Sequence, residues 1–342
     1  MDVREALAVV ASGGTLTRDQ ARGAMGAVMA GEATPAQLGA LLAALHVRGE
    51  TVDEIAGFAT ALRAAAVPVD LEDGAIDTCG TGGDRSNSFN ISTVSAIVAA
   101  AAGARVAKHG NRAASSACGS ADVLEALGVR IDLGPEAVSA CVRETGLGFM
   151  FAPRFHPAMR HAAPVRREIG IRTVFNVLGP LANPAGVRRQ LLGVPSPAFG
   201  ATIARVLGEL GATHALVVHG ADGLDEISPS GPTRVWELRD GRVDEWTLAP
   251  AAVGLEAAGR ERIAGGDAAR NAEIAREVLS GGGDGARTAV LLNAGAACYV
   301  AGLAGDVREG VATAARALDT GAASDTLARF VAASRRLGEG DA

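Results

Sequence analysis

Two loops that combine glycine with small polar residues carry most of the side chains in this sequence that could perform chemistry. They span residues 79–93 and 108–120, and each follows an apolar run of strand length and precedes a run typical of a helix. Glycine lets a ligand approach the backbone closely, and the free N–H groups at a helix start attract anions. Two such loops side by side predict a ligand with two phosphate groups some distance apart. For either loop alone, an ordinary capped turn is the alternative.

The first loop does not match the common nucleotide-binding motifs. A dinucleotide motif starting at Gly80 would need glycine where Arg85 stands, and no Gly-Lys-Ser/Thr follows as in a Walker A loop. Asn90, Ser92 and Thr93 instead place an amide and two hydroxyl groups at the predicted helix start, where the helix dipole is positive. This pattern favours an anion site of another type.

Lys108 opens the second loop and is the only lysine among the 32 Lys and Arg residues of the chain. Lysine is a compact point charge, whereas arginine is a broad planar fork, so the two are not equivalent beside a crowded phosphate. Chance survival of one surface lysine is the alternative. Asn111, Ser115 and Ser120 follow within the loop, which favours an anion site that contains a cation. His109 alone is more typical of a structural histidine.

Two further groups of charged residues lie outside the loops. Asp225 and Glu226 follow an apolar run, where adjacent acids are typical of a solvated turn. Beside a polyphosphate, the same pair could hold Mg²⁺, which takes one or two carboxylates and completes its coordination with water and phosphate. Arg166 lies in a predicted helix and could bind a carboxylate through two parallel hydrogen bonds. Arg167, next to Glu168, is more typical of a solvated helix face.

The elements that must position these residues fall into two regions. Residues 1–68 are predicted to be helical, because capping boxes precede apolar residues at helical spacing. The three boxes are Thr17 with Gln20, Thr34 with Gln37 and Thr51 with Glu54. Gly31 and Gly49 are expected to end two helices, and Pro68 follows the third. We therefore predict a small helical domain over residues 1–68, joined by part of 157–190, and a large domain over 69–342.

Beyond Pro68, strand-like and helical runs alternate, which predicts parallel βαβ units. The fold class expected is α/β, with a mostly parallel central sheet flanked by helices. Strands are expected at residues 75–79, 105–107, 129–131, 213–219 and 288–293, and helices from about Ser92, Ser120 and Pro135. Asp240 and Gly241, between Trp236 and Trp246, predict a hairpin. The glycine-rich residues 281–285 are interpreted as a connector before a strand.

Composition argues against several classes of protein. The 342 residues are 48% hydrophobic and 20% charged, so a large core can form and global disorder is excluded. A net charge of −6 argues against a nucleic-acid binder, which needs a dense basic surface. The most apolar stretch, residues 96–104, is far short of the ~20 residues of a membrane-spanning helix. Four cysteines without C-x-x-C spacing and an acidic start without a signal region predict a reduced, cytoplasmic protein without zinc.

Taken together, these motifs resemble the anthranilate phosphoribosyltransferase family closely. The matching strings are residues 80–84 (GTGGD), 90–93 (NIST), 108–112 (KHGNR), 119–128 (GSADVLEALG), 175–184 (FNVLGPLANP) and 225–226 (DE). No string is decisive alone, but their order is highly specific and the resemblance covers nearly the whole chain. Ala113, Ala114 and Cys118 depart from the pattern only at variable positions.

The resemblance implies that the chain transfers a phosphoribosyl group from phosphoribosyl diphosphate to anthranilate, in tryptophan biosynthesis, as a homodimer with Mg²⁺ as cofactor. It assigns Lys108, Asn111 and Arg166 to catalysis, with Gly80, Asn111 and Arg166 contacting anthranilate, and Ser92, Asp225 and Glu226 to Mg²⁺. The residues implied to bind substrate are Gly80, Gly83, Asp84, Ser88, Asn90, Ile91, Ser92, Thr93, Lys108, His109, Gly110, Asn111, Arg112, Ala113, Ala114, Ser115, Ser116, Ser120 and Arg166.

The implied chemistry matches these residue types. Loss of diphosphate from the anomeric carbon builds negative charge on the leaving group, which Lys108, Mg²⁺ and the helix starts would stabilise. The attacking aryl amine is neutral at pH 7, so we expect no dedicated base. A pyrimidine nucleoside phosphorylase and a non-catalytic nucleic-acid-binding relative are the alternatives on this fold. Asn111-Arg112, Arg166 and the acid pair speak against the first, and the absence of a basic surplus against the second.

Overall fold

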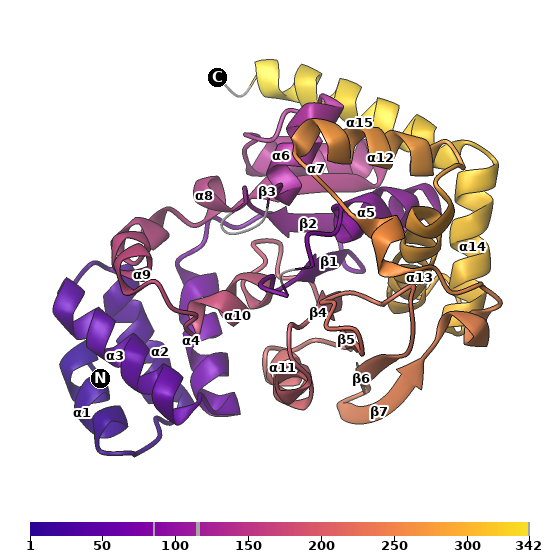
Figure 1. Ribbon diagram of the computed structural model, residues 1–342. Helices are drawn as coiled ribbons and strands as arrows, with labels where there is room; N and C mark the ends of the chain where they lie inside the picture. Colours follow the sequence, from indigo (N-terminus) through magenta and orange to yellow (C-terminus); the bar gives the residue numbers. More distant parts are fainter. Residues whose placement is uncertain (85, 114–116, 341–342) are drawn as a thin grey trace.

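The computed structural model describes residues 1–84, 86–113 and 117–340. The chain opens with the helices α1 (Val3–Ala11), α2 (Arg18–Met29), α3 (Pro35–Arg48) and α4 (Val52–Ala64). All three predicted capping boxes are present at the starts of α2, α3 and α4. Gly49 caps the end of α3 and Gly31 follows the end of α2, both with positive φ, as the sequence predicts. In Figure 1 these helices form a bundle at one side of the molecule.

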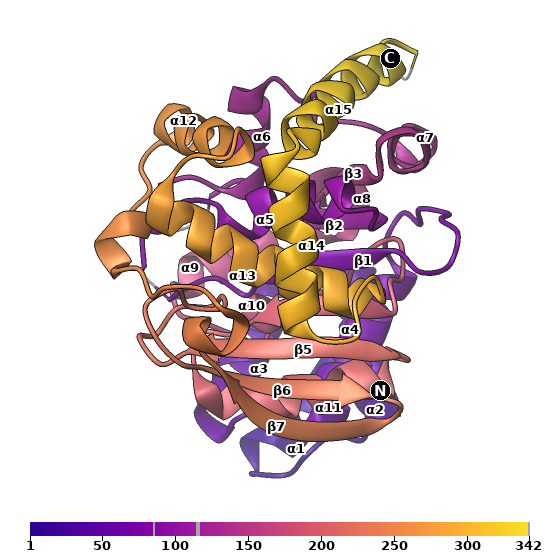
Figure 2. The ribbon, with the colours of Figure 1, turned by 90° about the vertical axis from the view of Figure 1, so that its right-hand side faces the viewer.

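A seven-stranded sheet forms the centre of the remaining chain, in the order β3-β2-β1-β4-β5-β6-β7. The strands are β1 (Ile76–Gly80), β2 (Val106–Gly110), β3 (Leu147–Phe151), β4 (Arg189–Gly193), β5 (His214–Gly220), β6 (Thr233–Arg239) and β7 (Arg242–Leu248). The first five strands in this order pair in parallel, and β6 and β7 are antiparallel. The predicted α/β fold with a mostly parallel sheet is confirmed. Figure 2 shows α14 in front of β1 and β2, with β5, β6 and β7 below.

Both faces of the sheet are covered, because successive residues of a strand point to opposite sides. Leu191 and Leu216 pack into a core with α5 (Ile91–Ala101), α12 (Ala268–Leu279), α13 (Asp284–Ala301), α14 (Val307–Asp319) and α15 (Ala322–Glu339). Leu192 and Ala215, one residue away in each strand, pack into a second core with α11 (Gly200–Glu209) and the N-terminal bundle. The bundle therefore shares its core with one face of the sheet.

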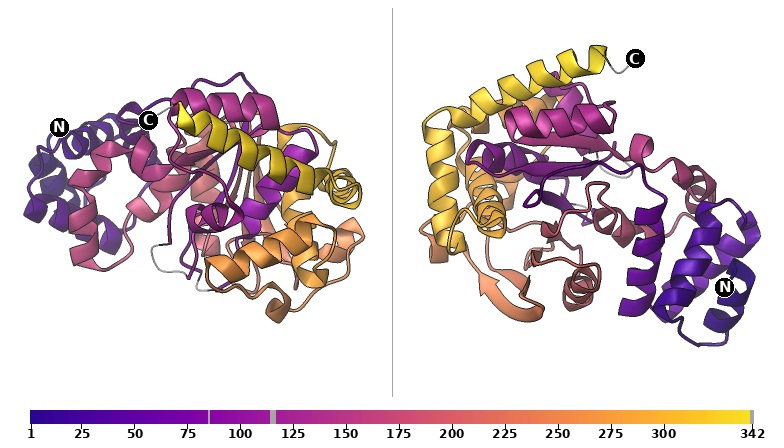
Figure 3. Two further views of the ribbon diagram at one scale, coloured as in Figure 1. Left: turned by 90° about the horizontal axis from the view of Figure 1, so that it is seen from above. Right: turned by 180° about the vertical axis from the view of Figure 1, so that it is seen from behind.

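One segment runs from the sheet to the bundle and back. After β3 it forms α8 (Ala152–Phe155), a 3₁₀ turn (Pro157–His161), α9 (Ala163–Ile169) and α10 (Phe175–Leu181). Val165 of α9 and Phe175 of α10 belong to the same core as the bundle residue Leu38. Figure 3 shows this segment between the bundle and the sheet. It brings residues from both parts of the chain together at one place.

Two predicted strands are wrong. Residues 288–293 lie inside helix α13, whose residues are buried almost all round, so that a short apolar run could not be told from a strand. The glycines at 281–285 consequently precede and begin a helix, with Gly283 at φ 88° as its cap. Residues 129–131 are not a strand either. The strand that pairs with β2 is β3, which follows α7 (Pro135–Thr145).

The remaining predicted elements are confirmed within a few residues, including α6 (Ser120–Leu127) and the Asp240-Gly241 hairpin between β6 and β7. Both turn residues have positive φ, 50° and 77°, as a two-residue hairpin turn requires. Within the described residues, no helix combines the length and the apolar character needed to cross a membrane.

Candidate active site

The two glycine-rich loops leave the carboxyl ends of the neighbouring strands β1 and β2. These strands share only the register pair Ile76↔Val106, whereas β1 pairs with β4 along its whole length. Side chains bridge the gap beyond that pair. The Asn183 amide nitrogen donates hydrogen bonds to Asp77 Oδ2 (2.7 Å) and to the Ala107 carbonyl (2.9 Å). Asp77 Oδ1 accepts the His109 N–H (3.3 Å). The strands therefore separate where the loops begin.

Lys108 lies in this gap, beneath the first loop. Only 3% of the residue is exposed, and its ammonium donates to the Thr78 carbonyl and to Ser92 Oγ (3.4 Å). The buried acid Asp77 and Glu226 both interact electrostatically with this cation. Lys108 is thus a buried charge below the helix start, and its predicted direct contact with a ligand stays a prediction.

Ser92 joins the first loop to the predicted metal ligands. Its backbone N–H at the start of α5 donates to Glu226 Oε1 (3.2 Å). Asp225 Oδ2 accepts the Gly82 N–H (2.7 Å), and the Asp225 N–H donates to Asp84 Oδ2 (3.4 Å). Asp225 and Glu226 are 9% and 8% exposed, so this is not the solvated turn that an acid pair alone would suggest. The structure brings the predicted metal residues together.

The acid pair is held in an unfavourable electrostatic state. Burial, followed by the charge of Asp84, raises the pKa of the Asp225 carboxyl to about 7. Burial, followed by the charge of Asp225, raises the pKa of the Glu226 carboxyl to about 8, although Lys108 opposes this shift. A divalent cation would relieve both effects. Across the described residues, no group of three or more His, Cys, Asp or Glu side chains converges into a metal site.

Asn293 of α13 fixes the backbone directly after Glu226. Its side-chain oxygen accepts the Ile227 N–H (2.9 Å), and its amide nitrogen donates to the carbonyls of Ile227 (3.0 Å) and Ala289 (2.9 Å). The residue is fully buried. The sequence analysis missed it because residues 288–293 were assigned to a strand. A buried asparagine in an apolar run is the signal that could have identified it.

Asn90 connects the two loops instead of pointing freely at a ligand. Its amide nitrogen donates to the Cys118 carbonyl in the second loop (3.2 Å), and its oxygen accepts from Asn271 Nδ2 (2.9 Å). Asn271, on α12, also accepts the Gly266 N–H (2.7 Å). A third segment, which the sequence analysis did not connect with the site, thereby lies against both loops.

The other predicted substrate residues are distributed around the loops. Ile91 and Thr93 are buried on α5, and Ser88 pairs with Ala264 in an isolated bridge.

In the second loop, Arg112 is bound to Asp122 (3.0 Å) and Glu125, and the Ala113 N–H also donates to Asp122 (2.9 Å). Ser120 Oγ donates to the Asn111 carbonyl (3.3 Å), directly beside Gly110, and Gly80 abuts Asp225. Ala114, Ser115 and Ser116 lie outside the described residues.

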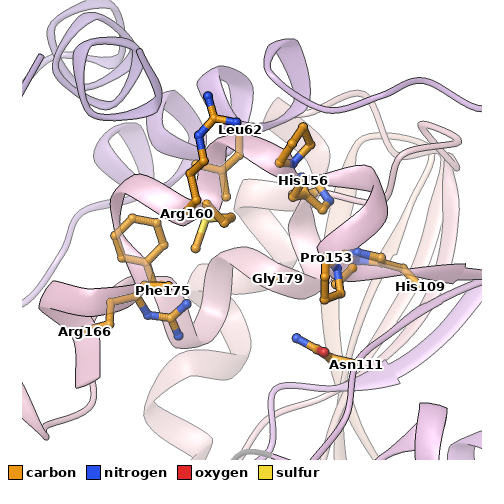
Figure 4. A pocket seen from close by; sticks show the side chains of 14 residues that line it. Leu62, His109, Asn111, Pro153, His156, Arg160, Arg166, Phe175 and Gly179 are labelled. Atoms are coloured by element: carbon orange, nitrogen blue, oxygen red, sulfur yellow. The ribbon is translucent and has the colours of Figure 1, made fainter. Parts of the chain in front are cut away.

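A cavity of about 400 Å³ opens beside the second loop, between the sheet and the bundle. Its lining includes three of the predicted residues, His109, Asn111 and Arg166, together with Leu62 of the bundle (Figure 4). The Arg166 guanidinium lies 5.0 Å from the ring centre of Phe175, and burial lowers its pKa. Arg160, which the sequence analysis did not single out, adds a second cation. The cavity therefore combines a largely apolar lining with cationic side chains, which suits an aromatic acid.

His109 and His156 form part of the same wall, with their ring centres 5.0 Å apart. His109 bonds to the Gly179 carbonyl and His156 to the Ala182 carbonyl, while the Nε2 atoms of both rings are buried without a partner among the described residues. Burial and the neighbouring ring lower the pKa of His109 to about 3, so it is neutral at pH 7.

Helix α10 ends at this wall, and side chains bind its last three carbonyls and that of its C-cap residue, Ala182. Besides the two histidines, Gln190 Nε2 donates to the Pro180 carbonyl (2.8 Å) and Arg63 Nε to the Leu181 carbonyl (2.7 Å). These bonds satisfy groups that a helix end otherwise leaves open.

Comparisons with known proteins agree with this arrangement. Residues 4–66 match the helical bundle domain of a glycosyl transferase family, and residues 72–324 match its α/β domain. An anthranilate phosphoribosyltransferase from Thermomicrobium roseum is 58% identical over 337 residues, which cover 97% of each chain.

Solved structures give the same result. The crystal structure of anthranilate phosphoribosyltransferase from Thermus thermophilus is 48% identical, with a TM-score of 0.92 over 98% of this chain and 100% of that one. The enzyme from Saccharomyces cerevisiae, in complex with phosphoribosyl diphosphate (PRPP) and Mg, is 28% identical, with a TM-score of 0.89 over 98% of both chains. At these identities over nearly the full length, the chain belongs to the anthranilate phosphoribosyltransferase family.

Proposed function

We propose that this protein transfers the phosphoribosyl group of PRPP to the amine of anthranilate, giving N-(5-phosphoribosyl)anthranilate and diphosphate. The observation that carries the proposal is the position of Asn111, which belongs to the second glycine-rich loop and also lines the cavity that contains Arg166. A sugar diphosphate in the loops and an aromatic acid in the cavity would therefore meet at this residue. The names of the relatives support the same reaction.

The cavity suits anthranilate in shape and in charge. Phe175, Met159 and Pro153 supply apolar surface for the ring, and the volume of about 400 Å³ is ample for one benzene ring with two small substituents. Arg166 would bind the carboxylate, because a guanidinium matches a carboxylate through two hydrogen bonds. Asn111 would then contact the amine on the side of the loops. These contacts orient the nitrogen towards the sugar.

The donor set fits Mg²⁺. Asp225 and Glu226 offer buried carboxylate oxygens whose pKa values are raised by burial and by neighbouring carboxylates, and Ser92 binds Glu226 through its N–H at the start of α5. These three residues would hold the cation, with water and phosphate oxygens completing its coordination. When bound, Mg²⁺ supplies positive charge to the diphosphate leaving group. The yeast relative was solved with PRPP and Mg.

The protein contributes mainly position and charge to the reaction. The C–N bond forms at the anomeric carbon as the C–O bond to diphosphate breaks, so negative charge grows on the leaving group. Lys108 opposes that charge from beneath Ser92, and the N–H groups of the first loop and of the α5 start add to it. The aryl amine attacks in its neutral form and loses its proton afterwards. We therefore assign no general base, and the neutral His109 remains a candidate contact only.

The full set of substrate residues given by the family resemblance is proposed on the same basis, as is the division into domains 1–68, with part of 157–190, and 69–342. We also propose a homodimer formed through the helical bundle and a cytoplasmic location. The shared core of Val165, Phe175 and Leu38 supports the assignment of α9 and α10 to the bundle.

The experiment is a set of parallel assays on the purified protein. We expect loss of anthranilate fluorescence that requires both PRPP and Mg²⁺, no phosphorolysis of pyrimidine nucleosides and no shift of DNA. Phosphorolysis without phosphoribosyl transfer would replace the proposal by a nucleoside phosphorylase. A DNA shift without either reaction would indicate a non-catalytic relative.

A further inference from the structure

Arg172 reaches across from the α9–α10 connection and lies on the first glycine loop. Its guanidinium Nη1 donates to the Gly82 carbonyl (3.1 Å). Gly83, at φ 85°, has no side chain, and a Cβ there would overlap the Arg172 guanidinium. The space above Gly83 is thus filled by a cation that comes from a segment 90 residues further along the chain. Neither the motifs nor the cavity accounts for this arginine.

The Gly82 peptide is bound on both sides. Its N–H donates to Asp225 Oδ2 (2.7 Å), a proposed ligand of Mg²⁺, and its carbonyl accepts from Arg172. The guanidinium therefore lies one peptide unit from the proposed metal site. A guanidinium has five N–H donors, and in the described part of the chain the Gly82 carbonyl is the only acceptor that Arg172 contacts. Most of its donors remain for a ligand.

A phosphate oxygen is a better partner than the one Arg172 has now. A phosphate carries a charge opposite to that of the guanidinium, which a carbonyl lacks, and arginine binds phosphate through two parallel N–H groups. A diphosphate over the loop would offer several charged oxygens to a cation that currently contacts one neutral carbonyl.

We propose that Arg172 is a further ligand-binding residue, which contacts the diphosphate group of the sugar substrate at the first glycine loop. This inference rests on the proposed function, because it takes the first loop as the diphosphate site. Arg172 lies between Arg166 and Phe175, both of which line the cavity for the aromatic substrate. A contact between Arg172 and diphosphate would therefore connect this wall of the cavity with the first glycine loop. Binding of PRPP would then order the site for anthranilate.

The alternative is that Arg172 only fastens two parts of the folded chain together. In that case its loss would lower stability and leave the intrinsic affinity for diphosphate unchanged. The two possibilities separate in an equilibrium measurement on inorganic diphosphate, which contains the group in question and lacks the rest of the substrate.

The test is isothermal titration of the full-length protein with inorganic diphosphate and Mg²⁺, for the parent, Arg172→Ala, Arg172→Gln and Arg172→Lys. Arg167→Ala is the matched control, because Arg167 is an exposed arginine on the same segment. We expect the dissociation constant to rise about tenfold in the Ala and Gln variants, which corresponds to ~1.4 kcal/mol. Lysine should restore part of the affinity, because it keeps the charge without the fork. The control should match the parent.

Steady-state kinetics add a second measurement. The KM for PRPP should rise in Arg172→Gln at saturating anthranilate, in parallel with the diphosphate constant. Diphosphate constants within twofold of the parent in both the Ala and Gln variants, with thermal unfolding showing folded protein, would overturn the inference. Failure of the parent itself to bind diphosphate would instead overturn the proposed function, so the two failures are distinguishable.

Discussion

Replacement of Glu226 by glutamine is expected to stabilise the metal-free protein near neutral pH while it removes a proposed ligand of Mg²⁺. Glu226 is 8% exposed, and burial together with the Asp225 charge raises the pKa of its carboxyl from 4.5 to about 8. A folded-state pKa above the unfolded value means that the folded protein binds the proton more tightly. Its contribution to stability is therefore complete below about pH 4.5 and is lost as pH rises towards 8.

The magnitude follows from the size of the shift. Each pH unit above the unfolded pKa costs about 1.36 kcal/mol while the folded carboxyl stays protonated, so the cost at pH 7 is about 3 kcal/mol. Glutamine keeps the shape and the oxygen that accepts the Ser92 N–H, but it cannot ionise. The variant should gain roughly this amount at pH 7 and nothing at pH 4. For a chain of this size the gain corresponds to roughly 5 °C in Tm.

The assay is thermal unfolding in EDTA at several pH values between 4 and 8. Glu256→Gln serves as the control, since Glu256 is exposed and the same chemical change there should leave the pH dependence unaltered. Added Mg²⁺ should raise the Tm of the parent at pH 8 and have much less effect on Glu226→Gln. A Tm difference between variant and parent that does not change with pH would refute the reasoning, because the effect would then not come from ionisation.

Three further changes test other parts of the site. Arg166→Ala should raise the KM for anthranilate more than that for PRPP, through loss of a contact worth ~1.5–3 kcal/mol; a larger effect on PRPP would move Arg166 to the phosphate site. Lys108→Arg should weaken PRPP binding roughly tenfold and also lower the Tm, because Lys108 is 3% exposed and a larger group strains a packed site. Kinetics and a Tm equal to those of the parent would contradict this. Asn293→Ala should leave the Ile227 N–H and carbonyl without their side-chain partner, which lowers the free energy of unfolding by ~1–3 kcal/mol, and should reduce the apparent affinity for Mg²⁺. An unchanged Mg²⁺ dependence would show that Asn293 only supports the fold.

The sequence was most informative where local rules decide the structure. The capping boxes at Thr17, Thr34 and Thr51 involve residues three positions apart, and all three helices begin as predicted. The turn at Asp240-Gly241 depends on two residues with positive φ and was equally predictable. The predicted metal residues were found together because the loops that follow parallel strands meet at one edge of a sheet.

The errors and omissions concern contacts between distant segments. The apolar residues 288–293 could form a strand or a buried helix, and only packing against the sheet decides for α13. Asn271 reaches Asn90 across 181 positions, and Arg172 reaches Gly82 across 90, so no local pattern could reveal either contact. For Lys108 the rarity of lysine marked the position, but its burial under Ser92 depends on the separation of β1 and β2.

The end of α10 has a consequence for the order in which the molecule assembles. The four consecutive carbonyls at this helix end, from Gly179 to Ala182, are bound by side chains at positions 63, 109, 156 and 190, which come from the bundle, from two strands and from the turn after β3. Such long-range bonds form only after the intervening chain has been organised, because closing each loop costs entropy before any contact repays it. We therefore expect this wall to be among the last parts to gain protection during refolding. The cavity for the aromatic substrate then exists only in the completed fold, and a partly folded chain cannot capture it.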